Sequence, residues 1–373
     1  MSNIVIIGGS YAGTKVAHKV LKDIPQARVT LIDPSDVFYF NIASPRIIAK
    51  PKDVNFGDFL IPIADKFKQY PPGGFTFVRG VVSSVDFKLK AVQVSGHHPS
   101  ISYDYLVVAS GSSTPGTIGQ EAIPFKATGD NKIRQSIEAA QQRVAKADDI
   151  IIVGAGPVGV ETAGEIAQAY PKKKVTLVAS HDRVLPALKS SASKAAEKSL
   201  VDLGVNIMYS TRVLKTTGGP SPGGTFTVHF DDGNSLDAAL VISAAGNIPN
   251  TSFMPKAALD PEGWINVDAG LRIASVTDGS AFALGDVTTF KQRYMLKVQD
   301  QIPVVAGNLK AAVSKSGNSL TYNANDKLMV MVPVGSKTGT GQIGGWVPFG
   351  FMVAFVKGRD YFMSKAASYI SAA

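Results

Sequence analysis

Two glycine-rich segments carry the residues that point most clearly to chemistry. The segments are Gly8-Gly9-Ser10-Tyr11-Ala12-Gly13 and Gly154-Ala155-Gly156-Pro157-Val158-Gly159. In each, the first glycine permits a tight turn, the middle small residue lets the backbone approach a pyrophosphate, and the last glycine lets a helix pack closely on a strand. The pyrophosphate would lie on the free N–H groups at the helix N-terminus, where the helix dipole favours negative charge.

The elements around the two segments follow the same order. The predicted strand, helix and second strand lie at 3–7, 14–21 and 28–32 in the first copy, and at 150–153, 160–170 and 174–178 in the second. Gly8 and Gly154 are 146 positions apart, as are Gly13 and Gly159. One such motif could be an ordinary loop, but two in register predict two βαβ dinucleotide-binding units.

The two copies differ at the positions that contact a nucleotide. The first has Ser10 in place of the middle glycine, and its second strand ends at Asp33, where a carboxylate can accept hydrogen bonds from a ribose diol. The second copy has Ala179 at the matching position, followed by His181 and Arg183. These two side chains could pair with a 2′-phosphate, which favours NADPH without excluding NADH. The alternative is that Arg183 is a solvated loop cation.

Three further apolar runs end in turns of small residues, at 105–111, 240–246 and 281–286. The first two runs occur once in each half of the chain and end at Gly111 and Gly246. The third ends at Asp286, whose carboxylate suits a hydroxyl-rich chain. All three turns are therefore candidate parts of a cofactor site.

Composition narrows the class of protein. A chain of 373 residues is longer than one hydrophobic core normally serves, so two or three domains are expected. The absence of cysteine excludes a disulfide framework, a thiolate metal site and a redox-active cysteine pair, and the 5 scattered histidines predict no metal site. The net charge of +9 favours anionic partners such as dinucleotides, acidic lipids or nucleic acid. The alternative is that the charge only keeps the protein soluble.

The start of the chain predicts its location. An apolar run from Asn3 leaves no room for a signal or transit peptide, and Ser2 does not match the N-myristoylation pattern. Apolar stretches fall short of the roughly 20 residues of a membrane span. We expect a cytoplasmic protein whose membrane contact, if any, is peripheral.

In chain order, the motifs GGSYAG, Asp33, YDYLVVASGS, GAGPVGVE, VISAAG and ALGD resemble FAD-dependent pyridine nucleotide oxidoreductases with two dinucleotide sites. The tail segments 341–345 and 357–362 are similar to one branch of that family. This is the branch of the apoptosis-inducing-factor-like inducer of death, or ferroptosis suppressor protein, which lies near type II NADH:quinone dehydrogenases.

The resemblance implies an α/β fold with two Rossmann-like domains of the glutathione-reductase type and a small C-terminal cap. The FAD-binding domain would be discontinuous, with residues 1–118 and 246–320. The NAD(P)H-binding domain would be formed by 119–245, and the cap by 321–373.

The resemblance also implies that FAD is held by the first glycine segment together with Asp33, Arg46, Val82 and Asp286. Independently, Arg46 is a cation in a Pro-bounded loop, where it could meet a phosphate or the flavin ring, or remain an ordinary surface charge. Val82 would offer only its backbone to the adenine.

Three residues are candidates for catalysis. Glu161 lies just inside the second glycine helix, and the resemblance places it beside the nicotinamide; the alternative is a carboxylate that only stabilises the helix N-terminus. Lys297 precedes a helix predicted over 304–315 and could add positive charge near the flavin. The resemblance makes Lys357 a hydrogen-bond donor to a quinone carbonyl.

The apolar segment 345–356 precedes Lys357. It has 12 residues and is broken by Pro348 and Gly350, so it is too short to span a membrane. Two interpretations remain: a strand in the core of the cap, or an apolar wall that admits a quinone or touches a membrane surface.

The predicted function is that of an FAD-dependent oxidoreductase that passes hydride from NAD(P)H to FAD and then two electrons to a quinone-like acceptor. One alternative is a redox-sensing flavoprotein that acts through partner or nucleic-acid binding. Another is reduction of a ferredoxin-like protein, which the apolar tail disfavours because such contacts are usually polar. The sequence leaves the oligomeric state and the choice between NADH and NADPH open.

Overall fold

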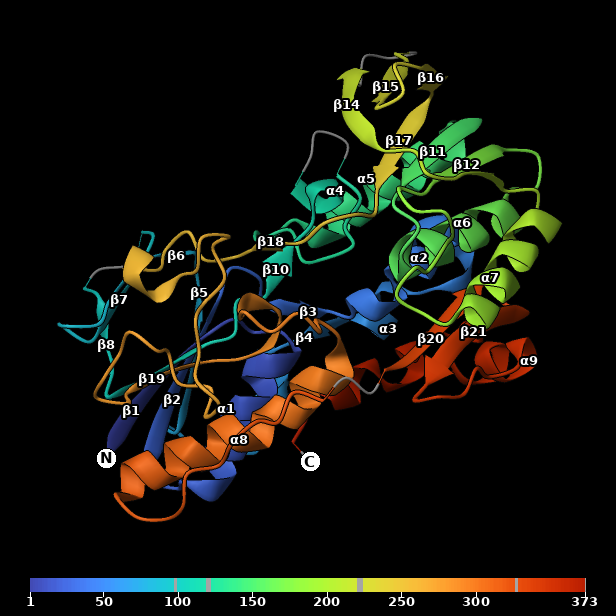
Figure 1. Ribbon diagram of the computed structural model, residues 1–373. Helices are drawn as coiled ribbons and strands as arrows, with labels where there is room; N and C mark the ends of the chain where they lie inside the picture. The colour runs from blue at the N-terminus through green and yellow to red at the C-terminus, as the bar shows by residue number, and fades with distance from the viewer. Residues whose placement is uncertain (97–98, 119–121, 220–223, 326–327, 373) are drawn as a thin grey trace.

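The computed structural model describes residues 1–96, 99–118, 122–219, 224–325 and 328–372. Figure 1 shows two units in which helices cover a parallel sheet, with a C-terminal segment packed beside them. The predicted α/β fold with two Rossmann-type units is confirmed. The predicted start of the second domain, residue 119, lies outside the described residues, and the domain boundaries stay a prediction.

The first unit is built on a parallel five-stranded sheet. Its strands are, in spatial order, β19 (Ala281–Ala283), β9 (Tyr105–Val108), β1 (Ser2–Ile7), β2 (Ala27–Asp33) and β5 (Phe75–Arg79). Ile4 and Ile6 pack into the core under helix α1 (Tyr11–Asp23), while Val5 and Ile7 pack into a second core on the other face. Because both faces are covered, the central strand is apolar from Ile4 to Ile7.

The second unit repeats this plan with four parallel strands. They are β13 (Asn206–Met208), β12 (Lys174–Val178), β11 (Asp149–Val153) and β17 (Leu240–Ser243). Helix α6 (Pro157–Ala169) follows β11 as α1 follows β1. Ile150 and Ile152 pack into one core and Ile151 into another, as expected for a strand covered on both faces.

The two glycine turns have the same geometry. Gly8 and Gly154 have φ angles of +109° and +107°, a region that favours glycine. A Cβ atom at Gly13 would lie 1.9 Å from the carbonyl oxygen of Gly8, and one at Gly159 would lie 1.8 Å from that of Gly154. Each helix therefore approaches its preceding strand as closely as the glycine pattern predicts.

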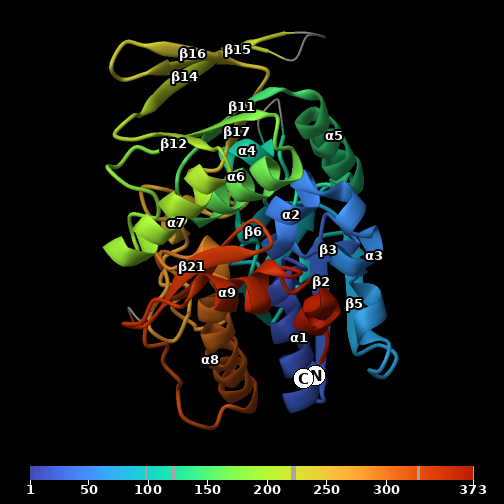
Figure 2. The same ribbon diagram turned by 90° about the vertical axis from the view of Figure 1, so that its right-hand side faces the viewer.

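Antiparallel pieces complete both units. Figure 2 shows β14 (Val213–Gly218), β15 (Phe226–Phe230) and β16 (Ser235–Ala238) at the end of the molecule away from α1 and helix α8 (Met295–Ser314). The other antiparallel strands are β6 (Val82–Asp86), β7 (Ala91–Val94), β8 (Ile101–Ser102), β3 (Val37–Tyr39), β4 (Leu60–Pro62), β10 (Ser112–Ser113) and β18 (Ile248–Pro249).

Further helices fill the connections. The α-helices are α2 (Ser44–Ala49), α3 (Phe56–Phe59), α4 (Pro115–Ile118), α5 (Ile133–Lys146) and α7 (Ser190–Asp202). The 3₁₀ turns are η1 (Asn41–Ala43), η2 (Pro51–Asp53), η3 (Ala64–Phe67), η4 (Lys256–Ala258) and η5 (Gly285–Val287). Among the described helices, none combines the length and the apolar character needed to cross a bilayer.

Helix α8 corrects one prediction. It starts at Met295, not at residue 304, and continues through Pro303. Proline lacks the N–H that an interior helical residue donates, yet here the helix extends two turns before it. Lys297 therefore lies within the first turns of the helix instead of before it.

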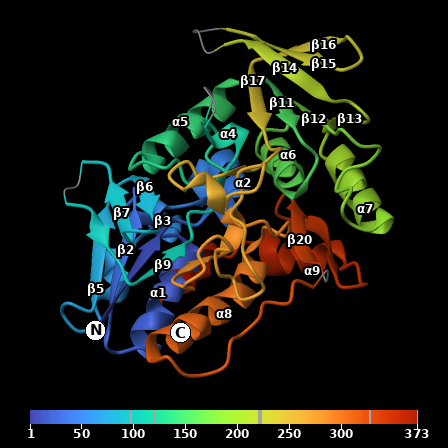
Figure 3. The same cartoon turned by 60° about the vertical axis from the view of Figure 1, so that its left-hand side comes forward.

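The C-terminal segment begins with a hairpin of β20 (Met329–Val334) and β21 (Thr338–Ile343). Helix α9 (Gly350–Val353), a π-helical turn η6 (Ala354–Gly358) and a 3₁₀ segment η7 (Met363–Ile370) follow. Strand β20 packs on α6, and η7 packs on α1, so the segment touches both units (Figure 3).

The interpretation of residues 345–356 as a core strand is wrong. The structure has α9 and most of η6 there, and Phe349, Phe351 and Phe355 are 65%, 69% and 72% exposed. The aromatic residues alternate with a period of two, which imitates a strand. The remaining interpretation, an apolar outer wall, agrees with their exposure.

Candidate functional site

A cavity of about 570 Å³ lies where the N-terminal ends of α1 and α6 come together. Its size falls within the range of ligand pockets. The predicted residues that line it are Ser10, Tyr11, Ala12, Asp33, Gly111, Gly156, Glu161, Gly246, Asp286 and Lys357. Gly8, Gly13, Gly154 and Gly159 do not line the cavity but shape the two turns behind it.

Asp33 presents a half-buried carboxylate to the cavity from the end of β2. Its Oδ2 accepts a hydrogen bond from the Gly9 N–H at 2.6 Å, and its Oδ1 accepts one from the Ser35 N–H at 2.9 Å. Burial raises the pKa of Asp33 to about 6, although both N–H donors oppose that shift. The carboxylate is therefore ionised above about pH 6 and can then accept hydrogen bonds from hydroxyl groups.

Asp286 forms a second polar cluster at the cavity, with Lys126 and Arg293. The sequence interpretation did not predict these two cations. The Lys126 ammonium lies 2.6 Å from Asp286 Oδ2. Arg293 Nε donates to the Asp286 carbonyl at 3.2 Å, and its guanidinium lies 3.5 Å from the centre of the Trp264 ring. Lys126 and Arg293 both line the cavity. Neither lies in a recognisable motif, and Lys126 is 160 positions from Asp286, so local spacing carried no signal.

Glu161 and Lys357 were predicted separately, and the structure joins them in one ion pair. Glu161 comes from α6 and Lys357 from η6, and Lys357 Nζ lies 2.6 Å from Glu161 Oε1. The side chains are 5% and 14% exposed, and Lys357 also donates to the Met331 carbonyl at 3.1 Å. Burial raises the pKa of Glu161, and the attraction of Lys357 only partly opposes this. A proton donor and a proton acceptor therefore meet at the cavity wall.

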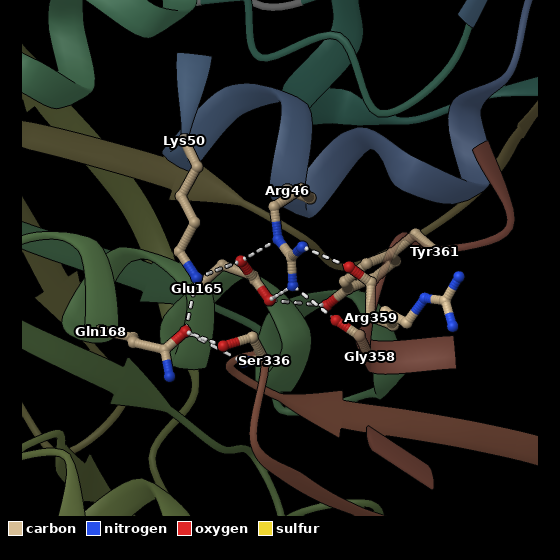
Figure 4. A network of polar contacts seen from close by, with 8 residues as sticks. All are labelled: Arg46, Lys50, Glu165, Gln168, Ser336, Gly358, Arg359 and Tyr361. Atoms are coloured by element: carbon tan, nitrogen blue, oxygen red, sulfur yellow. Dashed lines mark hydrogen bonds and ion pairs between the residues drawn. The ribbon is translucent and has the colours of Figure 1, made fainter. Parts of the chain in front are cut away.

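A second buried network lies one helical turn further along α6 (Figure 4). Glu165 accepts from Arg46 Nε at 2.5 Å and Nη2 at 2.8 Å, and from the Tyr361 hydroxyl at 3.3 Å. Lys50 Nζ lies 2.9 Å from the same carboxylate. The network thus joins residues that are distant in the sequence. Arg46 lies in α2 and Lys50 directly after it, Glu165 lies in α6, and Tyr361 lies in the C-terminal segment.

The structure places Arg46 away from the cavity lining. Its guanidinium, expected to meet a phosphate or the flavin ring, instead binds Glu165 and the carbonyls of Gly358 and Arg359. It is also buried, so the surface-charge alternative is wrong. Sequence spacing could not show this, because Glu165 is 119 positions away.

Four other predicted residues do not line the cavity. Lys297 is buried, and its Nζ donates to the carbonyl and Oδ1 oxygens of Asn325 at 2.8 and 2.7 Å. Val82 pairs with Val94 between β6 and β7. The other two are His181, which contacts Ser180 Oγ, and Arg183, which donates to the Pro186 carbonyl.

The Glu161–Lys357 pair predicts a coupling that unfolding experiments can measure. We expect Glu161→Gln and Lys357→Met each to lower the free energy of unfolding by about 3 kcal/mol, because each leaves a buried charge without its partner. The double variant should lose clearly less than the sum of the two single losses. Urea unfolding of all four proteins measures this, and strictly additive losses would contradict the pair.

Comparison with known proteins agrees with the motifs. Residues 2–307 match the family described as pyridine nucleotide-disulphide oxidoreductase. The oxidoreductase ptaL of Pestalotiopsis fici is 36% identical over 369 residues, which cover 96% of this chain and 95% of that protein. Ferroptosis suppressor protein 1 of Homo sapiens is 27% identical over 379 residues, covering 97% and 94%, so the resemblance to that branch is confirmed.

Solved structures show the same fold. The sulfide:quinone oxidoreductase of Aquifex aeolicus aligns with a TM-score of 0.77 at 15% identity, covering all of this chain and 92% of that chain. At this identity the likeness concerns the fold alone. The family assignment depends on the sequence matches, which extend over most of the length. The chain belongs to the pyridine nucleotide-disulphide oxidoreductase family.

Proposed function

We propose that this chain is an FAD-dependent NAD(P)H oxidoreductase whose electron acceptor is quinone-like. The observation that carries the proposal is one cavity that gathers two dinucleotide turns, two carboxylates and the buried Glu161–Lys357 pair. FAD, when bound, would take hydride from NAD(P)H and release two electrons to the acceptor. The chain's own residues would bind and orient the two nucleotides and manage the protons of the acceptor step.

The first unit fits FAD. Gly9, Ser10 and Tyr11 line the cavity at the start of α1, and no side chain caps that helix end, so its N–H groups are available to a pyrophosphate. Asp33 would accept from a ribose diol. A Cβ atom at Gly111 would meet nothing within 4 Å, so the backbone of this cavity-lining turn is open to a ligand.

The second unit fits NAD(P)H. Gly156 and Pro157 line the same cavity at the start of α6, where no side chain caps the helix either. Ala179 follows β12 without a carboxylate that would repel a 2′-phosphate. The missing carboxylate supports NADPH as the preferred donor, although His181 and Arg183, which come next in the sequence, do not line the cavity. Glu161 would then orient the nicotinamide from the first turns of α6.

The chemistry of the chain supports a small organic acceptor. The sequence contains no cysteine, so the disulphide chemistry in the family's description is not available to this chain. Human ferroptosis suppressor protein 1 and a sulfide:quinone oxidoreductase are among the similar proteins. Reducing a quinone to a hydroquinone takes two electrons and two protons. One of the two hydrogens originates in the hydride of NAD(P)H and the other is a proton from water. The Lys357 ammonium would donate a hydrogen bond to the acceptor's carbonyl oxygen, pass it one proton and regain that proton from water, while the Glu161 carboxylate would hold the ammonium in place.

The exposed aromatic side chains near Lys357 support a route for an apolar acceptor. Trp346, Phe349, Phe351 and Phe355 lie on α9, η6 and the loop before them, and the rings of Phe349 and Phe351 stack at 6.0 Å. Apolar side chains exposed on the segment that leads to Lys357 suit contact with a lipid surface, from which a lipid-soluble quinone would enter. Membrane contact of this kind would be peripheral.

The proposal predicts FAD in the purified protein and two fast half-reactions. Anaerobic stopped-flow absorbance would follow reduction of the flavin by NADPH and by NADH, then its reoxidation by a short-chain quinone. We expect faster reduction by NADPH and reoxidation that is complete with one quinone per flavin. Fast reduction followed by a reduced flavin that is inert to quinones would contradict the proposed acceptor and favour a redox-sensing role.

The raised pKa of Asp33 predicts pH-dependent FAD binding. Below about pH 6 the half-buried carboxyl binds a proton and accepts ribose hydroxyls less well, so FAD affinity should be lost as pH falls through this value. We expect about 10-fold weaker binding to the apoprotein at about pH 5 than at about pH 7.5, measured by flavin fluorescence.

The matched controls are two carboxylate variants. Asp33→Asn should bind FAD more weakly and with little dependence on pH, because its amide does not titrate. Asp65→Asn changes an exposed carboxylate that pairs with Lys68 in the same turn, so it should keep the wild-type dependence. A wild-type affinity that does not change across this range would rule out Asp33 as the titrating group.

A further inference from the structure

The backbone that carries Lys357 is unusual. Lys357 lies in the π-helical turn η6, and Tyr361 and Phe362 follow with φ angles of +53° and +64°. Side chains other than glycine rarely adopt this left-handed region, and two in succession need support from their surroundings. The position of the Lys357 ammonium therefore depends on contacts that hold this turn in place.

Arg46 makes those contacts. Its Nη2 donates to the Gly358 carbonyl at 2.7 Å and its Nη1 to the Arg359 carbonyl at 3.2 Å, the two carbonyls directly after Lys357. The turn closes through the Tyr361 N–H, which donates to the Lys357 carbonyl at 2.7 Å. A planar guanidinium is suited to this task because its donors are fixed in direction.

The Tyr361 ring connects the two ion-pair networks. The ring centre lies 5.1 Å from the Arg46 guanidinium carbon and 5.4 Å from the Lys357 ammonium, while the hydroxyl donates to Glu165. The two cations thus lie within cation–π distance of one aromatic ring. A shift of Arg46 would be transmitted to Lys357 through both the ring and the backbone.

The negative charge of Glu165 does not by itself explain why an arginine lies at position 46. Lys50 already lies 2.9 Å from the Glu165 carboxylate and is held there by Gln168 Oε1 at 2.5 Å. Gln168 in turn accepts from the N–H and the hydroxyl of Ser336 in the C-terminal hairpin. Lys50 is therefore sufficient to neutralise the Glu165 carboxylate. The hydrogen bonds from Arg46 to the Gly358 and Arg359 carbonyls serve a different purpose.

We propose that Arg46 is a positioning residue for the acceptor step. By binding the carbonyls of Gly358 and Arg359 and packing on Tyr361, it holds the η6 turn so that the Lys357 ammonium stays against Glu161 at the cavity. The kinetic part of this inference rests on the proposed function, because it assigns Lys357 to the acceptor. The structural part does not.

The test uses Arg46→Lys in the full-length holoprotein. Lysine keeps a positive charge beside the Glu165 carboxylate. Its single ammonium cannot also reach the carbonyls of Gly358 and Arg359. We expect hydrogen–deuterium exchange of the Tyr361 amide to accelerate about 10-fold, because the turn opens more often. Reoxidation of the reduced flavin by a short-chain quinone should slow about 10-fold, because Lys357 is misplaced. Hydride transfer from NADPH and FAD affinity should each stay within about twofold.

A double variant distinguishes positioning from general structural damage. In the Lys357→Met background, adding Arg46→Lys should not slow quinone reoxidation further, because Lys357 is the group through which Arg46 acts. The matched control is Arg134→Lys, since Arg134 also pairs with a glutamate and lies over an aromatic ring, but on the surface. It should leave exchange and both half-reactions unchanged.

Three results would overturn the proposal. They are unchanged exchange at the Tyr361 amide, a loss of FAD affinity that accounts for the slower reaction, or a further loss of similar size in the Lys357→Met background. If Arg46→Lys does not fold, Arg46→Met leaves Glu165 paired with Lys50 and should show the same faster exchange. Failure of the wild type to reduce any quinone would refute the proposed function, while the exchange result would still decide the positioning role.

Discussion

Helix α6 carries two buried glutamates one turn apart, and the rest of the structure must bring cations to both. Like charges at this spacing repel each other, and burial removes the water that would screen them. Lys357 from the tail pairs with Glu161, while Arg46 and Lys50 from α2 and the residue after it pair with Glu165. The second dinucleotide unit, the loop after the first unit's βαβ motif and the tail are therefore held together at one helix.

This constraint lies next to the chemistry. The same helix starts beside Gly156 on the cavity wall, so the turn proposed to bind NAD(P)H and Glu161, the partner of Lys357, share one rigid element. Buried ion pairs are expensive to desolvate and are weak evidence for stability. We interpret the two pairs as a device that fixes geometry: they determine where the tail lies and how far Lys357 reaches into the cavity.

Local sequence rules predicted the parts of the site that depend on short spacing. The glycine turns, Asp33 and Asp286 follow from the fixed geometry of a strand that ends in a tight turn, and all of them lie at or behind the cavity. Residues whose position depends on tertiary packing were harder to place. Arg46 is bound to a partner 119 positions away, and Glu161 to one 196 positions away, so no local pattern signals either pair. The predicted helix start at 304 missed the turns of α8 before Pro303, and the apolar segment 345–356 forms α9 and part of η6 instead of a strand.

We propose that Lys357 assists electron transfer to an acceptor that must also be protonated. The most direct test compares reoxidation of the reduced Lys357→Met variant by a short-chain quinone and by ferricyanide, which takes electrons without protons. We predict that the quinone reaction falls at least about 10-fold, in line with the loss of a general acid, while the ferricyanide reaction stays near the wild-type rate. An equal fall with both acceptors, or no fall with either, would contradict this role of Lys357.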